Sequence, residues 1–113
     1  MGDDYAAYIL ARAEILGGNF AFGLSLMPSN LDGLIGQESK KISALGKSQI
    51  GKAEQAAIEF ELLKNQAMRP ADKIVFSDMA ERARQIAAGQ SFLLGVYAKI
   101  LDNADLSRFQ KEN

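Results

Sequence analysis

The apolar repeat toward the carboxyl end of the chain constrains the fold more than any other feature. Its members recur at alternating spacings of three and four, which places them on one side of an α-helix. The repeat predicts a long helix from about Pro70 or Ser77 to Leu101, followed by a polar tail over 102–113 that we expect to fray. The members are Phe76, Met79, Ala83, Ile86, Gln90, Leu93, Tyr97 and Ile100.

The middle of this predicted helix carries no charge from Gln85 to Ala98, a span of about four helical turns. A helix that is uncharged on every side is usually surrounded by protein. One interpretation is that it is the central helix of this domain. The other is that the small chain cannot surround it, so a second copy or another protein covers its remaining apolar side. Gln90 lies in line with the apolar stripe, where it could fix the register of association, bond a backbone carbonyl or face outward.

Two further helices are predicted from apolar spacing. The first spans 4–16 and ends at the glycine pair Gly17-Gly18. The second spans 52–68 and ends at Arg69-Pro70, because a residue that precedes proline is disfavoured in the helical region. Its core-facing stripe consists of Ala53, Ala56, Phe60, Leu63 and Ala67.

The segment between these helices has its own signals. Ser29 and Asp32 stand three apart, as in a capping box, and predict that a helix begins directly after Ser29. Gly46 and Gly51 flank a predicted break or bend near its end. Before this helix, large residues stand at every second position of 19–27, as in a strand. If the same segment is a helix, Phe20, Leu24 and Met27 lie on one side of it. We favour the helix, because a lone strand would lack a partner.

Together these patterns predict an all-α fold, a bundle of four or five helices with the long C-terminal helix as its spine. The chain has 113 residues, which suits a single domain over 1–113. Its 48% hydrophobic and 24% charged residues are typical of a globular protein.

Missing residue types narrow the chemistry. The chain contains no cysteine and no histidine, so disulfides, thiolate nucleophiles, zinc–cysteine sites and serine–histidine pairs are excluded. An enzyme built on carboxylates or lysine would need pKa values shifted by burial. We therefore expect no enzyme activity, no cofactor and no metal site.

Charge and hydropathy bear on partners and location. A net charge of −1 argues against a nucleic-acid partner, because such binding rests on basic residues that neutralise phosphates. The uncharged run from Ile15 to Leu31 is interrupted by glycine and proline and is short for a membrane span. The amino terminus is acidic where a secretory signal is basic, so we expect a cytoplasmic protein or one exported without a classical signal peptide.

The function we expect is that of a non-catalytic structural or adaptor protein. It would self-associate or pack on a protein partner through apolar helix faces, as a homo-oligomer or a subunit of a larger assembly. The alternative is a small regulatory helical protein that binds nucleic acid or serves a larger machine. The candidate contact residues are Phe20, Phe22, Leu24, Met27, Gln90, Phe92, Leu93, Val96, Tyr97 and Ile100.

Overall fold

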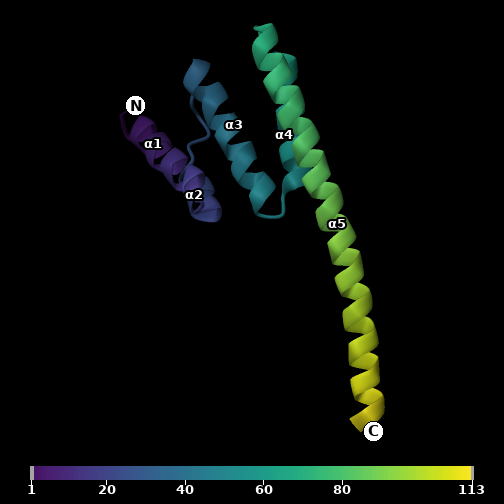
Figure 1. Cartoon of the computed structure of the whole chain (residues 1–113). Coiled ribbons are helices and arrows are strands. Elements are labelled where there is room, and N and C mark those ends of the chain that lie inside the picture. Colours follow the sequence, from purple (N-terminus) through teal and green to yellow (C-terminus); the bar gives the residue numbers. More distant parts are fainter. Residues whose placement is uncertain (1, 113) are drawn as a thin grey trace.

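The computed structural model describes the backbone of residues 2–112 and the side chains of residues 3–100. Within these residues the chain forms five α-helices and no strand, which confirms the all-α class (Figure 1). The helices are α1 (Gly2–Leu16), α2 (Phe20–Leu26), α3 (Gly33–Gln49), α4 (Ala53–Gln66) and α5 (Pro70–Glu112). The backbone of α5 continues past Leu101, where the apolar pattern ends; the side chains of the tail 102–113 lie outside the described residues.

The ambiguous segment 19–27 contains helix α2, as favoured over a strand. Gly18 turns the chain between α1 and α2 with a φ of 100°, a conformation that favours glycine. Gly23 then lies directly against α1, where a Cβ atom would stand 2.5 Å from Cγ1 of Ile15. Gly23 therefore permits the close contact of α2 with α1, whereas the small residues Ala21 and Ser25 on either side of it are exposed.

The predicted start of α3 was wrong. The helix begins at Gly33, its N-cap residue Asp32 forms no side-chain cap hydrogen bond, and the Ser29 hydroxyl instead lies 3.3 Å from Oδ1 of Asn30. The physical reason is the φ of 67° at Gly33, which keeps the preceding residues out of the helix.

The break predicted between Gly46 and Gly51 lies at the end of that stretch, because α3 continues through Gly46 to Gln49. Gly46 is buried, and a Cβ atom there would lie 3.3 Å from Cγ of Leu24. The chain turns instead at Gly51, where φ is 86°. Gly46 thus serves the packing of α2 on α3, and the loop glycine is Gly51.

The core lies mainly between α3, α4 and the first half of α5. The stripe predicted for α4 is buried from Ala53 to Ala67, with Phe60 only 1% exposed. From α5 it meets Phe76, Ala80 and Ala83, which belong to the same apolar cluster. The many alanines let the helices approach closely, while Phe60 and Phe76 fill the space between them. On the other side of α3, Tyr8 and Ile15 of α1 are buried as well.

A half-buried ion pair links α3 to α4. Nζ of Lys47 lies 2.6 Å from Oε1 of Glu59, and the side chains are 25% and 29% exposed. The second carboxylate oxygen of Glu59 is buried without a hydrogen-bond partner among the described residues. Lys47 therefore offsets the cost of burying the negative charge of Glu59 at the interface between α3 and α4.

Replacing Lys47 with methionine is expected to lower the free energy of unfolding by about 1–3 kcal/mol, because it leaves a partly buried carboxylate without its cation. Urea denaturation followed by circular dichroism measures the change. The matched control is Lys41→Met, which removes a more exposed pair with Glu38 and is expected to cost at most about 1 kcal/mol. Equal shifts in the two variants would contradict the structural role of the Lys47–Glu59 pair.

Helix α5 sets the shape of the molecule. Its 43 residues correspond to about 65 Å of helix, which matches the longest dimension of the chain, 64 Å. The radius of gyration is 18.7 Å, well above the ~13 Å of a compact domain of this size. Helix α4 packs along the first half of α5, α3 contacts it less extensively, and the second half of α5 extends beyond both (Figure 1).

Candidate interaction surface

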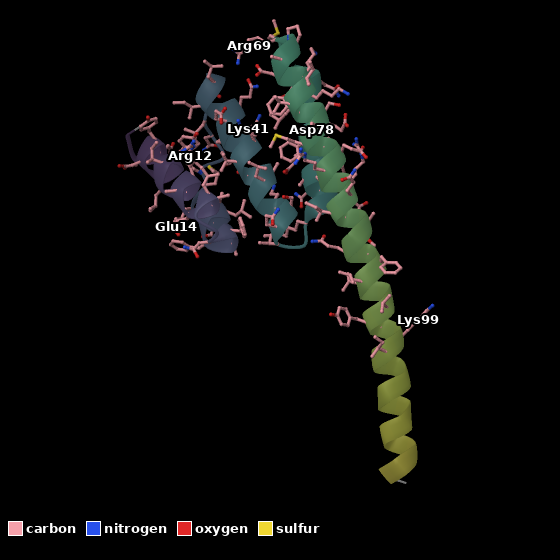
Figure 2. The ribbon with its side chains drawn as sticks, in the orientation of Figure 1. Arg12, Glu14, Lys41, Arg69, Asp78 and Lys99 are labelled. Carbon is pink, nitrogen blue, oxygen red and sulfur yellow. The ribbon has the colours of Figure 1, made fainter. Side chains whose placement is uncertain are left out.

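The projecting part of α5 is exposed on every side. We call residues Ser91–Ile100 the overhang; each of them is exposed, whereas Ile86 and Gln90 just before it are still half-buried. Figure 2 shows Lys99 on this segment, pointing away from the other helices. The overhang carries six large apolar side chains, whose exposed fractions range from 39% to 71%: Phe92, Leu93, Leu94, Val96, Tyr97 and Ile100.

The overhang begins where α5 loses its contact with α4. Close to this point the guanidinium of Arg84 binds two carboxylates, that of Glu61 on α4 and that of Glu81 on α5, each at 2.9 Å. The hydrogen bond from Arg84 lowers the pKa of Glu61. The hydrogen bonds to Glu61 and Glu81 raise the pKa of Arg84. This network links α5 to α4 at the surface, about two helical turns before the overhang begins.

The apolar residues of the overhang continue a stripe that is buried farther up the helix. Phe76 and Ala83 of this stripe are buried in the core, while Leu93, Tyr97 and Ile100 are more than half exposed. The uncharged run was interpreted either as a helix surrounded by this domain or as one covered by another chain. The first interpretation does not hold for the overhang. In the chain by itself, this part of the stripe faces solvent.

The apolar side chains cover a wide sector of the helix. At about 100° per residue they span an arc of about 200°, from Phe92 at one edge to Leu94 at the other. Ser91, Gly95 and Lys99 occupy the remaining strip, which is small or polar. Leu94, with 69% exposure, was not among the predicted contact residues, although it lies next to Leu93 within the uncharged run of the sequence.

The predicted contact residues of the segment 20–27 lie elsewhere. Phe20, Leu24 and Met27 are half-buried and Phe22 is 56% exposed. Helix α2 packs on α1 and α3, and within the described residues it makes no contact with α5. The structure therefore does not bring these four residues together with Phe92, Leu93, Val96, Tyr97 and Ile100, and only the second group forms a continuous exposed surface.

A groove that sequence reasoning missed lies between α2, α3 and α4. It has a volume of about 760 Å³, and Leu24 and Met27 line it together with Leu31 and Leu62. Lys40 also borders it. These residues are distant in the sequence and share no local pattern, so the groove was not predictable from it. The one available signal is Leu62, an exposed apolar residue that departs from the amphipathic pattern of α4.

Several charged side chains of residues 3–100 form ion pairs along the helices, such as Arg69–Asp72 and Asp78–Arg82, at 2.8 and 2.9 Å. Nowhere in that range do three or more histidine, cysteine or acidic residues gather as they would around a metal ion. Among the described helices, none combines the length and hydropathy that crossing a membrane requires.

Comparison with known proteins adds no further constraint. No protein-family model, characterised protein or solved structure matches the chain. The surface that stands out on physical grounds is the overhang, because it joins a large exposed apolar area to a helix whose first half is packed in the core.

Proposed function

We propose that the protein is a non-catalytic assembly subunit that associates with protein chains, copies of itself first, through the overhang of α5. The observation that carries this proposal is that all residues of Ser91–Ile100 are exposed and that six of them have large apolar side chains. Their exposed apolar area is on the order of 600 Å², given that a large side chain presents ~150–200 Å². Monomeric proteins rarely expose a contiguous patch of more than a few hundred Å².

The helical state of the overhang also supports association. Gly89 and Gly95 each disfavour the helix by about 1 kcal/mol relative to alanine. The uncharged run offers no Glu–Lys pairs across one helical turn to offset this. A helix with this composition gains its stability chiefly from tertiary or quaternary packing. Packing against other chains would supply what the overhang lacks within its own chain.

The nucleic-acid alternative draws less support from the geometry. Four lysines lie within 40–52, and two of them, Lys41 and Lys47, form ion pairs with Glu38 and Glu59. Phosphate contacts would have to compete with these carboxylates. We therefore do not propose it as a second function.

The proposal predicts a molar mass that depends on concentration. Light scattering over a dilution series is expected to give masses above the 12.3 kDa of the chain at high concentration. The unfolding temperature is expected to rise with protein concentration, since association stabilises the folded state. Leu93→Asp, in the middle of the apolar arc, is expected to give a 12.3 kDa monomer at the same concentrations, because assembly would bury its carboxylate among apolar side chains.

The matched control is Leu34→Asp on α3. Leu34 is 80% exposed and lies outside the overhang, so the same chemical change there is expected to leave the mass unchanged. A wild-type chain that is monomeric at every concentration, with a constant unfolding temperature, would contradict self-association. An equal effect of both substitutions would show that general hydrophobicity, and not the overhang, drives association.

A further inference from the structure

The groove between α2, α3 and α4 exists because two of these helices share a neighbour. Helices α2 and α4 both pack on α3, and within the described residues they make no contact with each other (Figure 1). The face of α3 between them carries the short side chains of Ser39 and Ser43, which leave the space above them open. The resulting volume of about 760 Å³ lies within the ~300–1,000 Å³ of small-molecule sites.

Apolar side chains from three segments line this groove. One wall comes from α2 and the loop that follows it, and the other comes from α4. On the α4 side, Leu62 is 54% exposed, so a molecule in the groove would remove apolar surface of this side chain from water. The apolar lining residues with the largest side chains are Leu24, Met27, Leu31, Ile50, Leu62 and Leu63. This lining suits the apolar body of a ligand.

The charged residues at the groove are mostly positive. Three lysines border it, Lys40, Lys47 and Lys52, against a single acid, which leaves two positive charges in excess. That acid, Glu59, and Lys47 neutralise each other in their ion pair at 2.6 Å. Lys40 and Lys52 form no ion pair within residues 3–100. An apolar groove bordered by such ammonium groups is complementary to a molecule with an apolar body and an anionic group.

Further hydrogen-bond donors lie near Lys40. Ser43 follows it by three residues and so stands one turn farther along the same side of α3. The hydroxyl of Ser39 donates to a carbonyl of its own helix, whereas that of Ser43 bonds to no described residue. Gln66 of α4 lines the groove and also a smaller adjoining cavity, which it shares with Lys40 and Asp32. An anion beside Lys40 can therefore accept hydrogen bonds from an ammonium, a hydroxyl and an amide group.

We infer that the groove binds a small amphipathic carboxylate, whose apolar body lies between Met27 and Leu62 and whose anionic group binds to Lys40 and Ser43. The groove is formed by residues of 21–66, whereas the overhang begins at Ser91. The inference therefore goes beyond the proposed function and does not depend on it. Either of the two can fail while the other stands.

Two probes with the same apolar chain and opposite charge test the inference in the full chain. Decanoate is expected to bind at least about tenfold more tightly than decyltrimethylammonium, because only the carboxylate is attracted by Lys40. Both are used below the concentrations at which they form micelles. Isotope-labelled methionine methyl groups locate the binding by NMR, since Met27 lines the groove and Met68, which is 91% exposed, does not. The overhang contains no methionine, so binding there does not shift Met27 directly.

Lys40→Glu is expected to weaken decanoate binding by about tenfold or more, because it places a negative charge beside the carboxylate. Lys52→Glu, at the other end of the groove, is expected to have a smaller effect. The matched control is Lys73→Glu on α5, which makes the same change of charge at a residue that does not line the groove. It is expected to leave the dissociation constant almost unchanged, since salt screens distant charges.

A second pair of substitutions tests the apolar body. Leu62→Ser removes part of one wall and is expected to weaken both probes several-fold. Its control is Ile58→Ser, one turn earlier on α4, where the side chain is 60% exposed and does not line the groove. Circular dichroism checks that every variant keeps its helices, which do not need these exposed side chains.

The outcomes decide as follows. A shift of Met27 but not of Met68 by decanoate, weakened by Lys40→Glu and not by Lys73→Glu, supports the site. An unshifted Met27, or equal affinity for the two probes, overturns it. Equal losses in Lys40→Glu and Lys73→Glu would show attraction by the charge of the whole chain and also overturn it. A larger loss in Lys52→Glu than in Lys40→Glu would overturn the assigned position of the anionic group.

Discussion

Replacing Phe60 with alanine is expected to lower the free energy of unfolding by about 3–5 kcal/mol. Phe60 is 1% exposed and lies in the cluster that joins α4 to Phe76 and Ala80 of α5. Six of the nine residues in this cluster are alanines, which cannot move into the cavity, while Leu45 and Met79 pack against its edge. Because domains are typically stable by only ~5–15 kcal/mol, we expect a large shift of the urea midpoint, measured by circular dichroism at a fixed protein concentration.

Phe22→Ala is the control for this prediction. It makes the same chemical change on α2, where the side chain is 56% exposed, and is expected to change stability by less than about 1 kcal/mol. If both variants shifted the midpoint equally, Phe60 would not occupy the centre of the core as described.

The second large effect is expected at Gly23, where alanine should destabilise the protein by about 1–3 kcal/mol. A Cβ atom there would stand 2.5 Å from Cγ1 of Ile15 and 2.9 Å from the carbonyl oxygen of Ala11. Because the second contact is to backbone, α2 must move away from α1. This strain exceeds the gain of about 1 kcal/mol that alanine brings to an ordinary helix position. Hydrogen exchange of the α1 amides, together with urea denaturation, measures the loosened contact.

Gly95→Ala provides the comparison. At Gly95 no atom lies within 4 Å of the Cβ position, so only the helix preference of alanine remains and stability should rise slightly or stay constant. The same sign of change at both glycines would show that Gly23 is not in tight contact with α1.

Elements with a clean local repeat were predictable from the sequence. The α4 stripe around Phe60 and Leu63 needs only the period of the helix, and the structure buries it as expected. The start of α3 was not predictable in this way, because the positive φ of Gly33 decides it and Ser29 offered a competing local signal. Likewise, the role of Gly46 depends on its contact with Leu24 of a different helix, which no local window contains.

The candidate surface was predictable in part for a related reason. The uncharged run marked α5 as the helix with surplus apolar residues, but it did not show which part of the helix would lack neighbours. That depends on element lengths: the 14 residues of α4 form a helix of about 21 Å, which covers only about a third of α5. The segment Phe20–Met27 was also expected to supply contact residues, but α2 packs on α1 and α3 and, within the described residues, makes no contact with α5.

In the chain order the overhang follows α1 to α4 and the first half of α5, which has a consequence for biosynthesis. Every helix that forms the folded domain precedes Ser91, and neighbours in the sequence make most of the contacts, which favours rapid folding. As the chain leaves the ribosome from its amino end, α1 to α4 and the first half of α5 can close their core before the apolar tip of α5 emerges. Under the proposed self-association, neighbouring nascent chains on one messenger RNA would meet as folded domains. The apolar side chains of the overhang would emerge only after the core has formed, when they can no longer compete with the core residues during folding.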